Sequence, residues 1–191
     1  MKNNISFVDF YTEHGVSPVS QDIFDLKRHF QRRDALLRSL RIPSVLVHDA
    51  KILEFGPGSG HNATYIASLD PSKYHLVDGN LKGVEDTKKL MSEYDINDLE
   101  VIHSLFLEYR SNALFDIVWA EGCIPHQSDP IDILRHLSSF TTKKGIFVAS
   151  MNNGVSYLSE TIRRVASSAH LNNNDSFQIK VDAIRPLLEG H

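Results

Sequence analysis

The sequence contains little cysteine, no long apolar run and no excess of basic charge. One cysteine among 191 residues excludes an internal disulfide framework and a thiolate zinc cluster. A net charge of −4 is not the basic balance typical of nucleic-acid-binding proteins, and apolar runs of only a few residues cannot span a bilayer. The opening stretch MKNNISFVDFYTEHG lacks the apolar segment and cleavage site of a signal peptide. A cytoplasmic protein without a nucleic-acid or membrane partner is therefore expected.

Beyond residue 50, short apolar runs alternate with stretches of helical spacing. The runs ILEF, FDIVWA and IFVA are apolar nearly throughout, as strands covered on both faces are. Strands separated by helix-length crossovers predict an α/β fold, with a doubly wound, mostly parallel sheet of at least five strands in three layers. The predicted strands are 51–55, 74–78, 99–103, 115–120 and 145–150. The predicted helices of this part are 61–69, 82–94, 129–140, 155–169 and 177–189.

The N-terminal part is predicted to form a helical cap. Gly15 and Pro18 break regular structure, so the first twenty or so residues are expected to be irregular, and Ser20 is the predicted N-cap of a helix over 21–41. The apolar positions at helical spacing are Ile23, Leu26, Phe30, Leu37 and Leu40. The basic residues assigned to the opposite face are Lys27, Arg28, Arg32, Arg33, Arg38 and Arg41. That face is either solvated or part of a lid that meets an anionic substrate.

The segment KILEFGPGSGHNATYIA at 51–67 places three glycines between a predicted strand and a predicted helix. A P-loop requires a Lys followed by Ser or Thr, whereas a histidine and an asparagine follow Gly60, and no Lys or Arg lies between Ile52 and Leu69. A dinucleotide fingerprint requires a third glycine for close packing beside the pyrophosphate. That position is His61, whose side chain would crowd the contact. The P-loop is excluded, and a dinucleotide is disfavoured.

The carboxylates around the turn favour a different nucleoside. S-adenosylmethionine carries an ammonium and a sulfonium and has no phosphate, so its site should offer carboxylates and carbonyls rather than cations. Glu54 lies just before the glycines, and Asp78 ends the second predicted strand, 18 residues beyond Gly60. A carboxylate there reaches ribose hydroxyls in α/β nucleotide folds. Gly56, Gly58 and Gly60 allow a tight turn and a close approach of the ligand.

The stretch LEFGPGSGHNA resembles motif I of the class I S-adenosylmethionine-dependent methyltransferases, an acidic residue and one spacer followed by G-x-G-x-G. HLVDGN resembles their second motif. FDIVWAEGCIPH and DPIDILRHLSSFTTKKGIFVAS resemble their fourth strand, the next helix and a Gly-initiated fifth strand. The resemblance covers residues 48–152. It implies a Rossmann-like methyltransferase fold, S-adenosyl-L-methionine as the cofactor, and methyl transfer to a small-molecule acceptor.

The same resemblance implies roles for particular residues. Glu54 and the glycine turn would line the methionyl and ribose side, and Asp78 would bind the ribose. The implied cofactor residues are Glu54, Gly56, Pro57, Gly58, Gly60, Asp78, Gly79, Asn80, Ser104, Leu105 and Glu121. His126 and Glu121 are the candidates for a catalytic base; the alternatives are a pocket-lining histidine and a carboxylate flanking a helix. No metal site is predicted.

The acceptor is expected over the ends of the fourth and fifth strands, beneath a cap. In the resemblance, the helix at 21–41 with Phe7, Phe10 and Tyr11 would form that lid, and its basic residues would suit an anionic or sugar-like acceptor. The predicted organisation is a cap over 1–45, a cofactor-binding core over 46–152 and a C-terminal helical segment over 153–191. Methyl transfer requires the donor and acceptor to be held close and aligned.

The C-terminal part departs from the family pattern. Members usually end with an antiparallel strand pair, but residues 155–191 have helical character, with FQIKV the one candidate strand. An uncovered edge strand invites pairing with another chain, so a homodimer or a missing C-terminal segment is expected. The rival function is a non-catalytic module that binds S-adenosylmethionine or S-adenosylhomocysteine. A nicotinamide-dependent oxidoreductase is a more remote alternative, disfavoured by His61.

Overall fold

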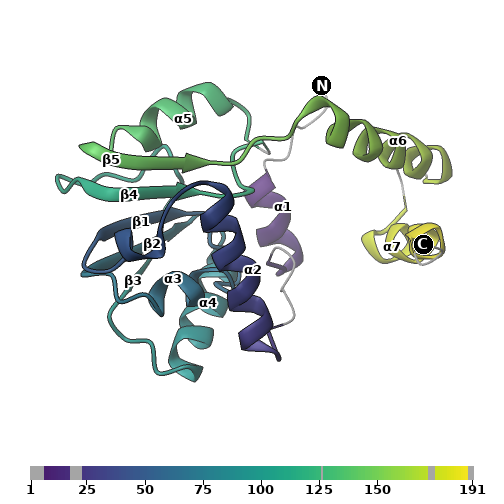
Figure 1. The fold of residues 1–191 in the computed structure, drawn as a ribbon. Helices are drawn as coiled ribbons and strands as arrows, with labels where there is room; N and C mark the ends of the chain where they lie inside the picture. Colours follow the sequence, from purple (N-terminus) through teal and green to yellow (C-terminus); the bar gives the residue numbers. More distant parts are fainter. Residues whose placement is uncertain (1–6, 18–22, 126, 172–174, 189–191) are drawn as a thin grey trace. The chain divides into compact units, whose positions relative to one another are not determined.

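The computed structural model describes residues 7–17, 23–125, 127–171 and 175–188. The chain divides into two compact units, Met1–Met151 and Asn152–His191. The first unit holds a five-stranded parallel sheet with the strand order β3-β2-β1-β4-β5, which confirms the predicted α/β doubly wound fold (Figure 1). The strands are β1 (Lys51–Phe55), β2 (Lys73–Asp78), β3 (Glu100–His103), β4 (Phe115–Ala120) and β5 (Thr141–Ala149).

Helices cover both faces of this sheet because alternate residues of its strands point to opposite sides. Ile52 and Ile117 pack with Leu37 in the core under α2, α3 and α4, whereas Leu53 and Val118 belong to the core on the α5 side (Figure 1). The helices are α2 (Leu26–Ser39), α3 (Ala63–Ala67), α4 (Leu81–Glu93) and α5 (Pro130–Ser138), with the short 3-10 helix η1 at Ser44–Leu46. Three layers result, as predicted.

The helix predicted over 21–41 begins later than expected. The predicted N-cap, Ser20, lies outside the described residues. Asp25 caps α2 instead, since its Oδ1 accepts a hydrogen bond of 2.9 Å from the backbone N–H of Arg28. An aspartate in this position satisfies a donor that the first helical turn leaves unpaired.

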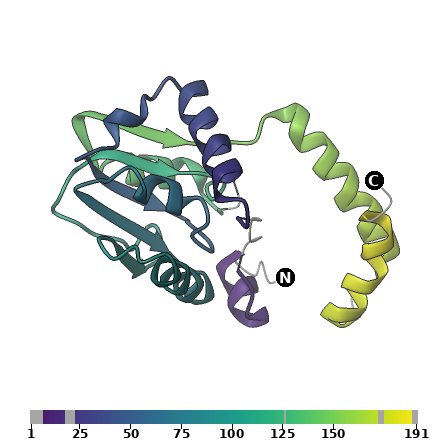
Figure 2. The same ribbon diagram turned by 60° about the horizontal axis from the view of Figure 1, so that its bottom comes forward.

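The expectation of an irregular N-terminus was wrong, because Phe7–His14 form helix α1. Gly15 ends this helix with φ +59, a left-handed conformation that glycine adopts without strain. The helix lies beside α4 (Figure 2). The segment that follows α1 is also fixed to the start of α4, since Asn80, the N-cap of that helix, donates its side-chain N–H to the carbonyl of Val16 at 3.0 Å. Gly15 thus ends a helix rather than breaking an irregular segment.

Strand β5 is longer than predicted. It begins at Thr141 rather than at Gly145, and its register with β4 shifts between Phe115 and Ile117. A side chain at Gly145 would bring Cβ within 2.7 Å of the carbonyl oxygen of Asp116, so glycine lets the irregular stretch stay close to its neighbour. Within the described part of the chain β5 pairs with β4 alone. No described strand pairs with its outer edge.

The second unit is helical, as predicted, with α6 (Gly154–His170) and α7 (Phe177–Leu188). The candidate strand FQIKV lies within α7, so that alternative was wrong. Along α6, Val155, Leu158, Ile162 and Val165 recur at helical spacing and are exposed by 60% or more. None of the helices in the described ranges is both long and apolar enough to cross a membrane.

Candidate cofactor site at the carboxyl edge of the sheet

The glycine turn after β1 is held in a left-handed conformation. Gly56, Gly58 and Gly60 have φ values of +71, +60 and +80, which strain any side-chain-bearing residue. The space is also restricted, because a Cβ on Gly56 would lie 2.5 Å from the Cβ of Cys123, and one on Gly60 would lie 3.0 Å from the methyl group of Thr87. Position 56 therefore requires glycine both for its backbone conformation and for the limited space beside Cys123.

Asp78, at the end of β2, locks the turn to the neighbouring strand. Its Oδ2 accepts from the backbone N–H of Gly58 at 3.0 Å, and its Oδ1 accepts from the N–H of Asn80 at 2.8 Å. Burial raises the pKa of Asp78, while the hydrogen bonds from Asn80 and Gly58 oppose that rise. Behind the turn, Thr87 of α4 donates its hydroxyl to the carbonyl of Gly58 at 2.9 Å. The carboxylate of Asp78, which the sequence singled out, is therefore fixed by hydrogen bonds from Gly58 on one side and Asn80 on the other.

Glu54 is a fully buried carboxyl group on the α2 side of the sheet. Burial raises its pKa from 4.5 to about 7, against the lowering effects of a hydrogen bond from Tyr74 and of the charge on Arg33. Tyr74 donates its hydroxyl to Oε2 of Glu54, and burial raises the pKa of Tyr74 well above its usual value. A nearby cation would favour the ionised form of Glu54.

Arg33 of α2 forms a two-pronged ion pair with Glu121 at the end of β4. Its Nη1 and Nη2 donate to the two carboxylate oxygens at 2.9 and 2.7 Å, and the indole N–H of Trp119 donates to Oε2 at 3.0 Å. The Arg33 side chain is only 10% exposed. Its assignment to the exposed basic face was therefore wrong. Burial acts to raise the pKa of Glu121, but the hydrogen bonds and charge of Arg33 and the bond from Trp119 together lower it, which makes Glu121 a weak proton acceptor.

The other predicted cofactor residues also follow strand ends. Ser104, after β3, donates its backbone N–H to the carbonyl of Asp78 at 3.0 Å, and its hydroxyl bonds to the carbonyl of Leu105 at 3.0 Å. A Cβ on Gly79 would lie 3.0 Å from the side chain of Leu105. Because the strands are parallel, their carboxyl ends meet at one edge, and the described candidates gather there. His126, the other catalytic candidate, lies outside the described residues.

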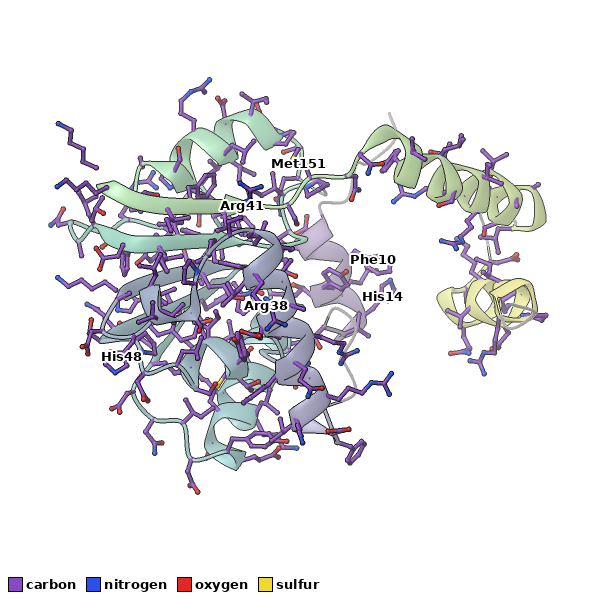
Figure 3. All side chains as sticks on the ribbon, in the orientation of Figure 1. Phe10, His14, Arg38, Arg41, His48 and Met151 are labelled. Carbon is purple, nitrogen blue, oxygen red and sulfur yellow. The ribbon has the colours of Figure 1, made fainter. Side chains whose placement is uncertain are left out.

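Helix α1 reaches the same edge. Burial, and then the charge of Asp78, raises the pKa of Tyr11, and the hypothetical Cβ of Gly79 would lie 3.4 Å from a methyl group of Val8. Phe10 and His14 project from one face of this helix with ring centroids 4.6 Å apart (Figure 3). The helix that the sequence did not predict thus places Tyr11 near Asp78.

Two residues of the site were missed in the sequence, Arg33 and Tyr74. A signal for Arg33 existed: it lies three positions after Phe30 and four before Leu37, inside the predicted apolar stripe of the helix. A charged residue within such a stripe is buried only when it is paired. No comparable signal marked Tyr74, because a tyrosine near the start of a strand is ordinary core material.

The raised pKa of Glu54 predicts how stability depends on pH. The folded chain holds the proton of Glu54 up to about pH 7, whereas the unfolded chain loses it near 4.5. Stability therefore falls between these values, by at most about 3 kcal/mol. In Glu54→Gln, which keeps an acceptor for Tyr74, this fall should disappear. Denaturant unfolding at pH 5 and pH 8 measures it, with the exposed Glu108→Gln as the control. An unchanged pH dependence in Glu54→Gln would contradict the burial argument.

Comparison with known proteins agrees with this geometry. A family model described as a methyltransferase domain matches residues 27–177. Among solved structures, PKMT2 from Rickettsia typhi in complex with AdoHcy has a TM-score of 0.59 at 24% identity, over 75% of this chain and 28% of that one. The YcgJ protein from Bacillus subtilis has a TM-score of 0.58 at 17% identity, over 71% of this chain and 58% of that one. No curated protein matches.

A third structure, a SAM-dependent methyltransferase from Thiobacillus denitrificans in complex with S-adenosyl-L-homocysteine, has a TM-score of 0.52 at 19% identity, over 61% of this chain and 46% of that one. These likenesses show a shared fold, and the chain spans between 28% and 58% of the three structures. The family match covers well over half of the chain and agrees with the predicted cofactor. The chain therefore belongs to the methyltransferase domain family, as a class I, Rossmann-like S-adenosylmethionine-dependent methyltransferase domain.

Proposed function

We propose that this chain binds S-adenosylmethionine at the carboxyl edge of β1 and β2 and transfers its methyl group to a small-molecule acceptor. The observation that carries the proposal is the anchoring of Asp78, whose two oxygens each accept one backbone N–H, from Gly58 and Asn80. A carboxylate has about four acceptor positions, so Asp78 retains capacity for ribose hydroxyls. Its orientation is set before a ligand arrives.

The donor set fits a cationic nucleoside. The buried or half-buried carboxyls at this edge are those of Glu54, Asp78 and Glu121, and Arg33 is the cation that acts on Glu54 and Glu121 among the described residues. The glycine turn offers backbone without Cβ atoms where the chain bends, so a ligand can approach closely. Such a set is unsuited to a pyrophosphate, which favours cations and unobstructed N–H groups.

The bound cofactor would supply an activated methyl group. The task of the protein is then to hold the acceptor in line with that group and to exclude water. Because the Glu121 carboxylate is already engaged by Arg33 and Trp119, we assign it to positioning rather than to proton abstraction. His126 remains our candidate base for a hydroxyl or amine acceptor.

We further propose an anionic or sugar-like acceptor, with α1 and α2 as parts of its cap. Arg28 and Arg32 of α2 are exposed, and we assign them to contact with such a molecule. The open edge of β5 supports association with a second copy of the chain. The matched structures are longer than this chain, so acceptor-binding parts present in them can differ here.

The cofactor assignment is tested by calorimetric titration of the full chain with S-adenosylmethionine, S-adenosylhomocysteine and NAD. Both adenosyl ligands should bind, and NAD should not. In Asp78→Ala their affinity should fall by about 100-fold, because two charge-assisted hydrogen bonds to the ribose are lost. The exposed Asp98→Ala serves as the matched control and should bind as wild type does.

Thermal melts accompany each titration, since Asp78 also holds the turn. A variant that melts as a folded protein and has lost affinity supports the ribose role. The cofactor assignment is wrong if wild type binds neither adenosyl ligand, or if folded Asp78→Ala binds them with unchanged affinity.

A further inference from the structure

The guanidinium of Arg33 has donors that the ion pair with Glu121 does not use. An arginine carries five N–H donors in a planar fork. Glu121 occupies the end of that fork, since its two oxygens accept from Nη1 and Nη2. The Nε–H is buried and has no hydrogen-bond partner among the described residues. One side of the fork, formed by Nε and the adjacent Nη, is therefore left for a second bidentate acceptor.

A buried donor without a partner is costly, by about 1–3 kcal/mol, and such groups in folded proteins call for an explanation. Arg33 as a whole residue is 8% exposed, so bulk water does not readily supply the partner. Burial lowers the pKa of Arg33, whereas the charges of Glu121 and then of Glu54 raise it. Arg33 thus lies between the carboxylate before the glycine turn and the carboxylate that ends β4.

These two carboxylates bracket the place assigned to the methionyl half of the cofactor. That half ends in an amino acid with one ammonium and one carboxylate. Glu54 can attract the ammonium, but no acidic side chain can hold the carboxylate, which needs a cation. Arg33 is the cation described in this cluster, and a guanidinium matches a carboxylate bidentately.

Resting on the proposed function, we propose that Arg33 binds the α-carboxylate of the methionyl group through the unused side of its fork. The site thereby selects adenosyl ligands that carry a complete amino-acid end. Glu121 acts through Arg33, since its two hydrogen bonds fix the plane and the rotation of the guanidinium. The simpler alternative is that Arg33 only fastens α2 to β4.

Three ligands separate the two roles in calorimetric titrations of the full chain. S-adenosylhomocysteine has the whole amino-acid end, its decarboxylated analogue lacks the carboxylate alone, and 5′-methylthioadenosine lacks the amino-acid end. In wild type, removal of the carboxylate should weaken binding by about 10- to 100-fold, the range of a charge-assisted bidentate contact.

The variant Arg33→Met should lose the same 10- to 100-fold in affinity for S-adenosylhomocysteine and keep its affinity for 5′-methylthioadenosine within about 2-fold. It should no longer distinguish the decarboxylated analogue. Arg33→Lys, which keeps the charge without the planar fork, should fall between the two. The matched control is Arg32→Met, an exposed neighbour on the same helix, which should bind all three ligands as wild type does.

The proposal is overturned if Arg33→Met weakens all three ligands equally, which is the signature of a purely structural role, or weakens none of them. The wild-type comparison of S-adenosylhomocysteine with its decarboxylated analogue needs no variant, so equal affinities there refute the proposal even if Arg33→Met does not fold. If wild type binds none of the three ligands, the cofactor assignment itself is wrong.

Discussion

Replacing Gly56 with alanine is expected to destabilise the chain by about 3 kcal/mol and to weaken adenosyl-ligand binding by more than about 100-fold. The φ of +71 at Gly56 costs a side-chain-bearing residue about 1–2 kcal/mol. In addition, the new methyl group would lie 2.5 Å from the Cβ of Cys123, and relief of such overpacking costs a further ~1–3 kcal/mol. Thermal melts and titration with S-adenosylhomocysteine measure the two effects.

The contact with Cys123 can be separated from the backbone strain. Gly15→Ala is the matched control, because Gly15 has φ +59 and no atom of the described residues lies within 4 Å of the position that a Cβ would take there; only the strain should appear. Combining Gly56→Ala with Cys123→Gly should recover part of the loss, whereas Cys123→Ala removes the Sγ at 3.0 Å but retains the Cβ at 2.5 Å and should recover less. If Gly56→Ala is no less stable than Gly15→Ala, the steric argument fails.

Removing Glu121 is expected to destabilise the chain more than removing its partner does. Glu121→Leu leaves the guanidinium of Arg33, whose side chain is 10% exposed, buried without the carboxylate that pairs with it. Breaking a buried pair in this way costs about 3–5 kcal/mol. Arg33→Met leaves a carboxylate that is 31% exposed and still accepts from Trp119, so the loss should be nearer to about 1 kcal/mol. Chemical denaturation of the two variants measures the difference.

The double variant Arg33→Met with Glu121→Leu provides the control. Because it removes both charges of the pair, it should be more stable than Glu121→Leu alone, despite having one more substitution. Equal losses in the two single variants would mean that water or another group solvates Arg33 once Glu121 is gone. That result would also weaken the case for an unused donor on Arg33.

Most of the sheet and the cofactor edge could be predicted from the sequence. Apolar runs locate β1 and β4, and the glycines with Glu54 and Asp78 indicate the ligand class, because those features depend on local pattern and on parallel topology. Gly15 is a typical signal for the end of a helix, here α1, but a glycine is equally compatible with a break in an irregular segment. A short helix with a C-terminal glycine and a turn with a glycine are alike at this level.

The remaining features depend on tertiary contacts. A charged arginine ordinarily favours an exposed position, so the charge of Arg33 argued against burial. Arg33 is buried because the fold brings it to Glu121, which lies 88 residues further along the chain. Similarly, Gly145 was expected to start β5, whereas it lies within the strand, against the backbone of Asp116. Neither partner can be identified by periodicity, because the chain must first form the sheet.

The packing of Cys123 against Gly56 also has a consequence for chemical modification. The thiol donates to the carbonyl of Phe55 at 3.3 Å, and burial raises its pKa to about 12. Thiolates, not thiols, react with alkylating agents and oxidants, so this sulfur is protected while the segment after β4 stays on β1. Since it is the only cysteine in the chain, its rate of alkylation reports the opening of the glycine turn without removal of competing thiols.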